Sequence, residues 1–237
     1  MKDWSGNTPR PGFTLIELLA VIAVIAILAS LIITVGGNTL KHSRASEAAV
    51  QVRQILLAGQ LYANEHGGHL PKVASDNVGL DEPRDYFYVT RNGVAETEGT
   101  ALAAYMGGAE AAAAGLRAPN DAGLAEVGQP GRNFSYTFNF LINQGELQEG
   151  ASEPSGFEKA LSTINLYYVD DPAEKVIVYE EENPNDAFCV WFIDRPSSRF
   201  DGKGHVGFVD GHVELLPADE IYGSAELGEI VPPDKQY

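Results

Sequence analysis

The chain has 237 residues and a formal net charge of −17 at neutral pH. This acidic balance argues against nucleic-acid binding, because contacts to phosphate depend on lysine and arginine. Cys189 is the one cysteine, which excludes an internal disulfide and a metal site built from cysteines alone. The length is sufficient for one globular domain with a core, preceded by an N-terminal segment of different character.

Residues 1–12 form a short polar leader, and residues 13–35 form a long apolar run in which Glu17 is the only charged residue. A helix of this length spans the ~30 Å hydrocarbon core of a bilayer at ~1.5 Å per residue. Because the apolar run follows Gly12 and is longer than the core of a signal peptide, we expect it to be retained. A lone carboxylate in a membrane segment is costly, so Glu17 is a candidate functional residue.

The sequence Gly12-Phe13-Thr14-Leu15-Ile16-Glu17 closely resembles the N-terminus of type IV prepilins and type II secretion pseudopilins. The resemblance implies cleavage after Gly12 by a prepilin peptidase, N-methylation of Phe13, and self-assembly with other pilin or pseudopilin subunits. It also implies a cytoplasmic leader, a single pass through the inner membrane and an extracytoplasmic head, which later belongs to a cell-surface or periplasmic filament. Basic residues flank the apolar run on both sides, so charge alone does not set its orientation.

The implied cleavage gives Glu17 a partner. Cutting after Gly12 creates a free amine on Phe13 and makes Glu17 the fifth residue of the mature chain. A carboxylate in hydrocarbon needs an opposite charge, and the amine of a neighbouring subunit would neutralise both groups and set the register of assembly. The alternative is a carboxylate that is tolerated near the membrane interface.

Residues 36–66 are predicted to be the amphipathic second half of the same helix. An apolar stripe repeats at spacings of three and four residues, as in a helix with one buried face: Ala45, Ala48, Val52, Ile55, Gly59 and Tyr62. Gly36-Gly37 marks either a helix end or a bend within a continuing helix, and the stripe favours continuation. Gly67-Gly68 and Pro71 are expected to end the helix.

Residues 67–237 are predicted to form a globular head rich in β-strands. Strands are expected at residues 133–140, 175–179 and 187–193, and a hairpin at residues 205–216 around Asp210-Gly211. Short helices are expected at residues 100–106 and 109–116. The pattern predicts an α+β fold, a pilin-like lollipop whose long N-terminal helix packs on an antiparallel sheet of four or five strands.

Residues 198–213 carry a second resemblance, to the C-terminal segment of a large prepilin subgroup. That segment has a histidine, nine residues, and then Asp-Gly. Asp210-Gly211 matches it, and so does the following His212-Val213. Phe200 stands where the subgroup has its histidine, so the role of that histidine does not transfer to this chain.

Acidic residues gather at the predicted strand ends. Asp194, Asp201 and Asp210 are typical turn formers, and as hard carboxylates on loops they are also candidate ligands for a Ca²⁺ cofactor. Glu180-Glu181-Glu182 is interpreted as a solvated strand edge. Cys189 is expected to be a small buried residue.

No nucleophile triad, phosphate-binding glycine loop or zinc-protease motif occurs in the sequence. We therefore expect no enzyme activity, and the prepilin resemblance implies a structural subunit. The alternative is a membrane-anchored extracytoplasmic domain that binds a ligand or metal and uses a pilin-like signal only for export.

Overall fold

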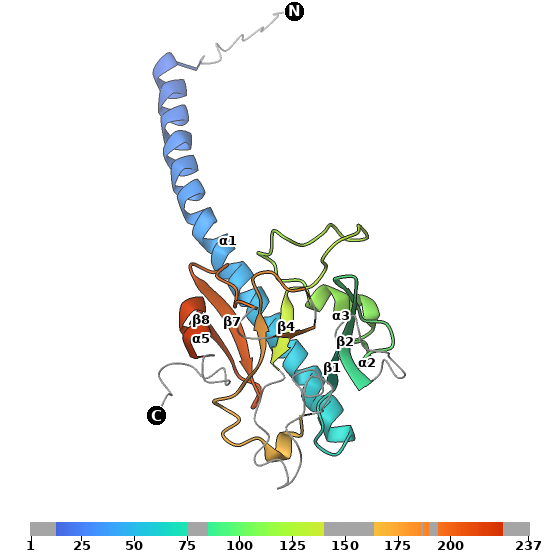
Figure 1. The fold of residues 1–237 in the computed structure, drawn as a ribbon. Helices are drawn as coiled ribbons and strands as arrows, with labels where there is room; N and C mark the ends of the chain where they lie inside the picture. The colour runs from blue at the N-terminus through green and yellow to red at the C-terminus, as the bar shows by residue number, and fades with distance from the viewer. Residues whose placement is uncertain (1–12, 75–84, 140–163, 186, 190–193, 225–237) are drawn as a thin grey trace, which may run out of the picture. The chain divides into compact units, whose positions relative to one another are not determined.

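Helix α1 (Leu15–Glu65) is the first element of the computed structural model, which describes residues 13–74, 85–139, 164–185, 187–189 and 194–224 (Figure 1). Two β-sheets and several short helices follow it, which confirms the predicted α+β class. The chain forms two compact units, residues 1–43 and 44–237, and α1 contributes to both.

Helix α1 confirms the helix predicted over residues 13–66. It begins two residues later and ends one residue earlier than predicted. It continues through Gly36-Gly37, so the prediction of a continuing helix is confirmed over that of a helix end. The helix stops where Gly67 adopts a φ of 66°, in the left-handed region that favours glycine. The amide of Gly68 donates to the carbonyl of Ala63 at 2.8 Å, the long-range bond of a Schellman motif.

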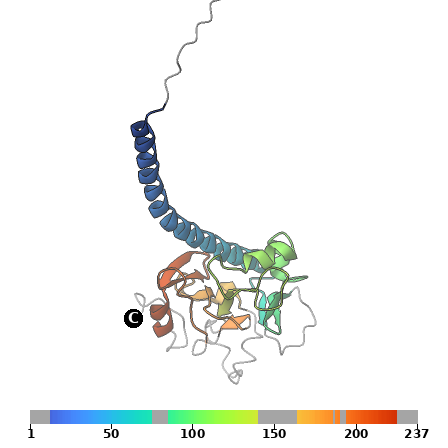
Figure 2. The same cartoon turned by 90° about the horizontal axis from the view of Figure 1, so that it is seen from above.

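The predicted apolar stripe of α1 is buried in the second unit. Ala48, Val52, Ile55, Gly59 and Tyr62 are buried, and Ala45 is half-buried. Figure 2 shows the strands of both sheets on one side of this part of the helix. A Cβ on Gly59 would lie 2.9 Å from the Phe87 ring, so glycine allows the helix backbone to approach the sheet closely.

The first sheet has three strands in the order β1 (Lys72–Ala74), β2 (Tyr86–Arg91) and β3 (Val94–Glu96). Strand β2 pairs in parallel with β1 and antiparallel with β3. The turn between β2 and β3 uses Asn92 and Gly93, both with positive φ, as a type I′ hairpin requires. Strands β1 and β3 are too short to show alternation, and the sequence pattern did not predict them.

The second sheet has five strands in the order β6-β4-β5-β7-β8, within the predicted number. The strands are β6 (Phe188–Cys189), β4 (Tyr136–Asn139), β5 (Val176–Glu180), β7 (Lys203–Phe208) and β8 (Val213–Pro217). All neighbours are antiparallel except β4 and β6, which are parallel. The ends of two predicted strands, at residues 140 and 190–193, and the side chain of Cys189 lie outside the described residues.

Strands β7 and β8 form the predicted hairpin, but its turn differs from a two-residue Asp-Gly turn. Gly207 pairs with Val213, and the amide of Phe208 donates to the carbonyl of His212 at 3.0 Å. Gly211 has a φ of 96°, whereas Asp210 is not among the residues with positive φ. The loop is therefore a three-residue turn with glycine at the left-handed position.

Two short helices confirm the helices predicted between the sheets: α2 (Ala101–Tyr105) and α3 (Ala109–Gly115). Thr100 caps α2 by accepting a hydrogen bond from the amide of Ala103. Later in the chain come the 3₁₀ turn η2 (Leu166–Tyr168) and helix α5 (Ala218–Ser224). One core joins the two sheets, and within it the rings of Phe87 and Phe138 stack at 4.0 Å.

Candidate functional site

The start of α1 is a capping box formed by Thr14 and Glu17. The backbone amide of Thr14 donates to Glu17 Oε2 at 2.8 Å, and the Thr14 hydroxyl donates to the same oxygen at 2.7 Å. In return, the amide of Glu17 donates to Thr14 Oγ1 at 3.3 Å. These bonds occupy amides that a helix start would otherwise leave without partners, so the Thr14-x-x-Glu17 spacing fixes where α1 begins. Phe13 and Thr14 lie outside the helix.

The carboxylate of Glu17 is only half engaged in this arrangement. Both bonds from Thr14 end on Oε2, and no hydrogen bond from a described residue reaches Oε1. Glu17 is exposed within its unit. One oxygen of the only charged side chain in the apolar run is therefore open to an external donor.

The surface around Glu17 is apolar. Every residue from 13 to 30 is exposed in its unit. The large side chains include Phe13, Leu15, Ile16, Leu18, Leu19, Val21, Ile22, Val24, Ile25, Ile27 and Leu28. A contiguous apolar surface of this kind marks contact with protein or lipid.

Within the described part of the chain, no helix combines the length and apolar character needed to cross a membrane. The side chains of residues 31–38 lie outside the described set. The structure therefore does not confirm the predicted membrane span over residues 13–35.

The three candidate calcium ligands are not brought together. Asp201, with a φ of 53°, lies in the turn before β7, and Asp210 lies in the turn after it. At ~3.3 Å per residue, that strand places roughly 20 Å between the two turns. Asp194 is buried, and its backbone carbonyl accepts a hydrogen bond from the Tyr179 hydroxyl at 3.1 Å.

No group of three or more His, Cys, Asp or Glu residues in the described ranges could hold a metal ion. Asp201 and Asp210, two of the predicted calcium ligands, are turn residues. Asp210 shows this directly, because its Oδ1 accepts the amide of His212 at 3.0 Å. This is the Asx-turn role that competes with metal binding at such positions.

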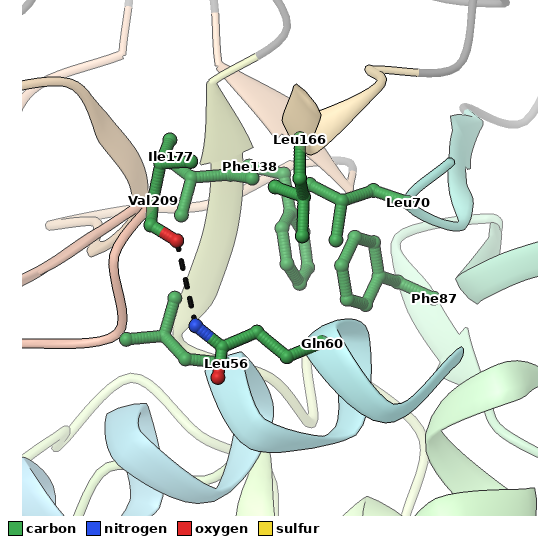
Figure 3. Close-up of a pocket in the computed structure, with 8 residues that line it drawn as sticks. All are labelled: Leu56, Gln60, Leu70, Phe87, Phe138, Leu166, Ile177 and Val209. Atoms are coloured by element: carbon green, nitrogen blue, oxygen red, sulfur yellow. Dashed lines mark hydrogen bonds between the residues drawn. The ribbon is translucent and has the colours of Figure 1, made fainter. Parts of the chain in front are cut away.

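A crevice between α1 and the strands is also a poor ligand site (Figure 3). Its lining is apolar apart from one side-chain amide: Leu56, Gln60, Leu70, Phe87, Phe138, Leu166, Ile177 and Val209. The amide of Gln60 already donates to the carbonyl of Val209 at 3.4 Å. A small-molecule site usually adds several convergent polar groups to its apolar walls, and these lining residues provide one.

Glu180 and Glu181 correct the prediction of a solvated edge, because both are buried. Arg199 Nη1 lies 3.1 Å from Glu180 Oε1 and donates to the carbonyl of Glu181 at 2.8 Å. His205 Nδ1 lies 3.4 Å from the other oxygen of Glu180. A buried carboxylate needs such partners, and Arg199, distant in the sequence, supplies one to Glu180.

The same arginine joins a second ion pair. Arg199 Nη2 lies 3.1 Å from Asp121 Oδ2. Arg132 binds both oxygens of Asp121, at 2.6 and 2.8 Å, and the Ser135 hydroxyl donates to Oδ2 at 2.8 Å. Burial alone would raise the pKa of Asp121, but these hydrogen bonds and the charge of Arg199 outweigh it and hold the pKa below its usual value.

We call Asp121, Arg132, Glu180, Arg199 and His205 the ion network. Sequence reasoning did not find it, because its members lie on separate segments and no local spacing connects them. Phe200, which replaces the histidine of the prepilin subgroup, is buried and packs edge-on against His205 with ring centroids 4.7 Å apart. The network joins separate segments of the head by ion pairs, in a chain that has no internal disulfide.

Comparison with known proteins identifies the N-terminal site. Residues 9–33 match the family model described as the prokaryotic N-terminal methylation motif. The chain therefore carries the prepilin-type cleavage and methylation signal, as the resemblance predicted. Neither the curated proteins nor the solved structures gave a match to the chain.

The matched signal indicates the general class of protein to which this chain is similar. It supports a type IV pilin-like or pseudopilin precursor and indicates a structural subunit rather than an enzyme. It implies processing by a prepilin peptidase and pilin-type assembly of subunits, and it suggests a membrane-anchored, exported protein. The match ends at residue 33, and the head lies outside it.

Proposed function

We propose that this chain is a prepilin-like structural subunit of a type IV pilus or a type II secretion pseudopilus. A prepilin peptidase removes residues 1–12 and methylates Phe13, and the mature chains then assemble through their apolar helices. The observation that carries the proposal is the methylation motif at residues 9–33. The exposed apolar surface of residues 13–30 supports it, because such a surface needs lipid or other helices around it.

In this proposal Glu17 has two roles, one for each carboxylate oxygen. Oε2 stays with Thr14 and keeps the helix start intact. Oε1 accepts the terminal amine of Phe13 from a neighbouring subunit, which neutralises two charges in an apolar setting. Docking at this point sets the register between subunits.

The runner-up function, an anchored ligand- or metal-binding domain, gains no support from the described residues. Among them no metal-holding cluster occurs, and the crevice of Figure 3 has an apolar lining with a single polar side chain. No specific observation on the described residues therefore favours this second function over a structural subunit.

The proposal is tested by intact-mass and N-terminal analysis of the full chain, purified from its native membrane. We expect a chain that begins at methylated Phe13. A chain that still begins at Met1, in cells with an active prepilin peptidase, would contradict the proposal.

The role of Glu17 is tested with two variants that separate charge from capping. Glu17→Ala removes both functions, whereas Glu17→Gln keeps a side-chain oxygen for Thr14 and loses the charge. We expect both variants to be cleaved normally and both to reduce the filament content of sheared fractions. Normal assembly of Glu17→Gln would show that capping alone matters and would refute the pairing with Phe13.

A further inference from the structure

Strand β8 lies at one edge of the five-stranded sheet. The strand order places it beside β7, and in the described part of the chain no other strand pairs with it (Figure 1). An edge strand presents a row of backbone N–H and C=O groups to which a further strand can bind, and proteins usually protect such a row with lysine, proline or a covering segment. Strand β8 has no lysine and one proline, Pro217, at its last position. We call its first four residues, 213–216, the β8 edge.

The register of the hairpin shows which backbone groups of β8 face outward. The amide of Phe208 donates to the carbonyl of His212 at 3.0 Å, so these two residues form a hydrogen-bonded pair. Hydrogen-bonded and non-hydrogen-bonded pairs alternate along an antiparallel ladder, and the β7–β8 pairing continues without a register shift. Val213 and Leu215 therefore belong to non-hydrogen-bonded pairs, and their N–H and C=O groups point away from β7.

The two faces of β8 differ in character. Neighbouring residues of a strand point to opposite faces of the sheet, so Glu214 and Leu215 lie on different sides. Glu214 pairs with Val206, which packs in one cluster with Ile221 of α5, so Glu214 is on the side of α5. Leu215, on the other side, is 37% exposed. A strand added at the β8 edge therefore has an acidic side chain beside one of its faces and an exposed leucine beside the other.

The surroundings of the β8 edge are acidic. Residues 210–224 contain four carboxylates and no lysine or arginine. Asp210 and Glu214 are partly exposed, and the ring of His212 lies between them and offsets at most one of these charges. The other two carboxylates are in the first turn of α5, which directly follows β8. Complementary charge selects partners at an interface, so the β8 edge favours a strand with positive charge.

The same charges disfavour this chain as its own partner. Residues 225–237 contain three carboxylates and one lysine. A second copy of β8 brings another Glu214 to the contact, in a chain whose formal net charge is −17. Like charges that lie opposite each other destabilise a pair of strands. A basic segment of a different polypeptide does not meet this repulsion.

We propose that the β8 edge binds an extended segment of a different polypeptide, in which basic and apolar residues alternate. Val213 and Leu215 together offer two donors and two acceptors to its main chain. In β-strand addition such main-chain bonds supply affinity, and the side chains supply specificity. The basic side chains lie toward Glu214 and α5, and the apolar ones contact Leu215. Pro217 has no N–H and limits the length of the contact.

Hydrogen exchange of the full chain in detergent micelles tests this contact. The probe is a synthetic hexapeptide of alternating lysine and valine. One control is a hexapeptide of alternating glutamate and valine, and the other is spermine, which has positive charge and no amide groups. We expect the lysine–valine peptide to slow exchange of the Val213 and Leu215 amides by about tenfold, and each control to slow it by less than about twofold.

Two variants at one position separate backbone pairing from side-chain contact. Leu215→Pro removes an outward N–H and spares the ladder with β7, because the amide of Leu215 points away from β7. We expect this variant to lose the protection of Val213 by the lysine–valine peptide. The matched variant Leu215→Ala keeps the N–H and should retain that protection within about twofold. Near-ultraviolet circular dichroism verifies that both variants fold.

The unmodified chain decides the inference even if Leu215→Pro does not fold. Slow exchange of both amides before any probe is added would show that the chain itself occupies the β8 edge. Equal protection by the glutamate–valine peptide would refute the preference for basic segments, and equal protection by spermine would refute strand pairing. An absence of protection by the lysine–valine peptide would overturn the contact altogether.

This inference does not depend on the proposed function, because the β8 edge belongs to the head, outside the matched residues 9–33. The two are therefore tested separately. Protection of Val213 and Leu215 supports the β8 contact whichever residue begins the chain. A chain from the native membrane that still begins at Met1 contradicts the proposed function and leaves the β8 contact unaffected.

Discussion

Arg199 holds two buried carboxylates at once, and its removal gives the sharpest test of how the head is stabilised. Its side chain is 8% exposed, and the side chains of Asp121 and Glu180 are 2% and 0% exposed. Arg199→Met keeps most of the stem and removes the charge. Removing one partner of a buried ion pair costs about 3–5 kcal/mol, because the remaining charge stays buried without compensation. In a domain of this size, that loss lowers the melting temperature by about 10 °C.

The assay is thermal and denaturant unfolding of the full chain in detergent micelles, followed by near-ultraviolet circular dichroism. This signal reports on the buried rings of Tyr88, Tyr136 and Tyr179 and thus on the head. The matched control is Arg91→Met, because Arg91 and Glu96 form an ion pair with side chains 60% and 51% exposed. An exposed pair contributes about 0–1 kcal/mol. If Arg199→Met costs no more than Arg91→Met, the ion network does not stabilise the head and the reasoning fails.

Three further predictions concern single positions. The pKa of Asp121 is lower in the folded head than its usual 3.8. Its contribution to stability is therefore present above about pH 4 and is lost as the pH falls through the folded value. Asp121→Asn lacks this contribution, so acid unfolding of the variant should begin at higher pH. Gly207→Ala should cost about 1–3 kcal/mol in denaturant unfolding, because its Cβ would lie 2.7 Å from Leu56 and 2.8 Å from Val52. Thr14→Val should lower the protection of the first-turn amides of α1 in hydrogen exchange by about fivefold, and Thr14→Ser should preserve it; equal protection in both would refute the capping box.

The features that sequence reasoning predicted well are those encoded locally. The stripe through Val52, Ile55 and Gly59 repeats every three or four residues, and only a helix places such residues on one face. The glycines after His66 end that helix because glycine adopts the left-handed conformation at little cost. The hairpin at residues 205–216 was predicted from Asp210-Gly211 between apolar runs, and only its turn type was different.

The features that sequence reasoning missed depend on partners elsewhere in the chain. Glu180-Glu181-Glu182 has the composition of an exposed edge, and nothing near it indicates that Arg199 reaches its first residue.

The ion network links separate segments of the head, in a chain whose single cysteine excludes an internal disulfide. Arg199 connects the segment before β7 to Asp121, which follows α3, and to Glu180 at the end of β5. A disulfide can join two such segments covalently and becomes labile under reducing conditions. Ion pairs between segments persist as long as their carboxylates stay ionised. The stability of this head should therefore be indifferent to a thiol reductant and sensitive to acid, because protonation of Asp121 removes the counter-charge of Arg132 and one of the two carboxylates that pair with Arg199.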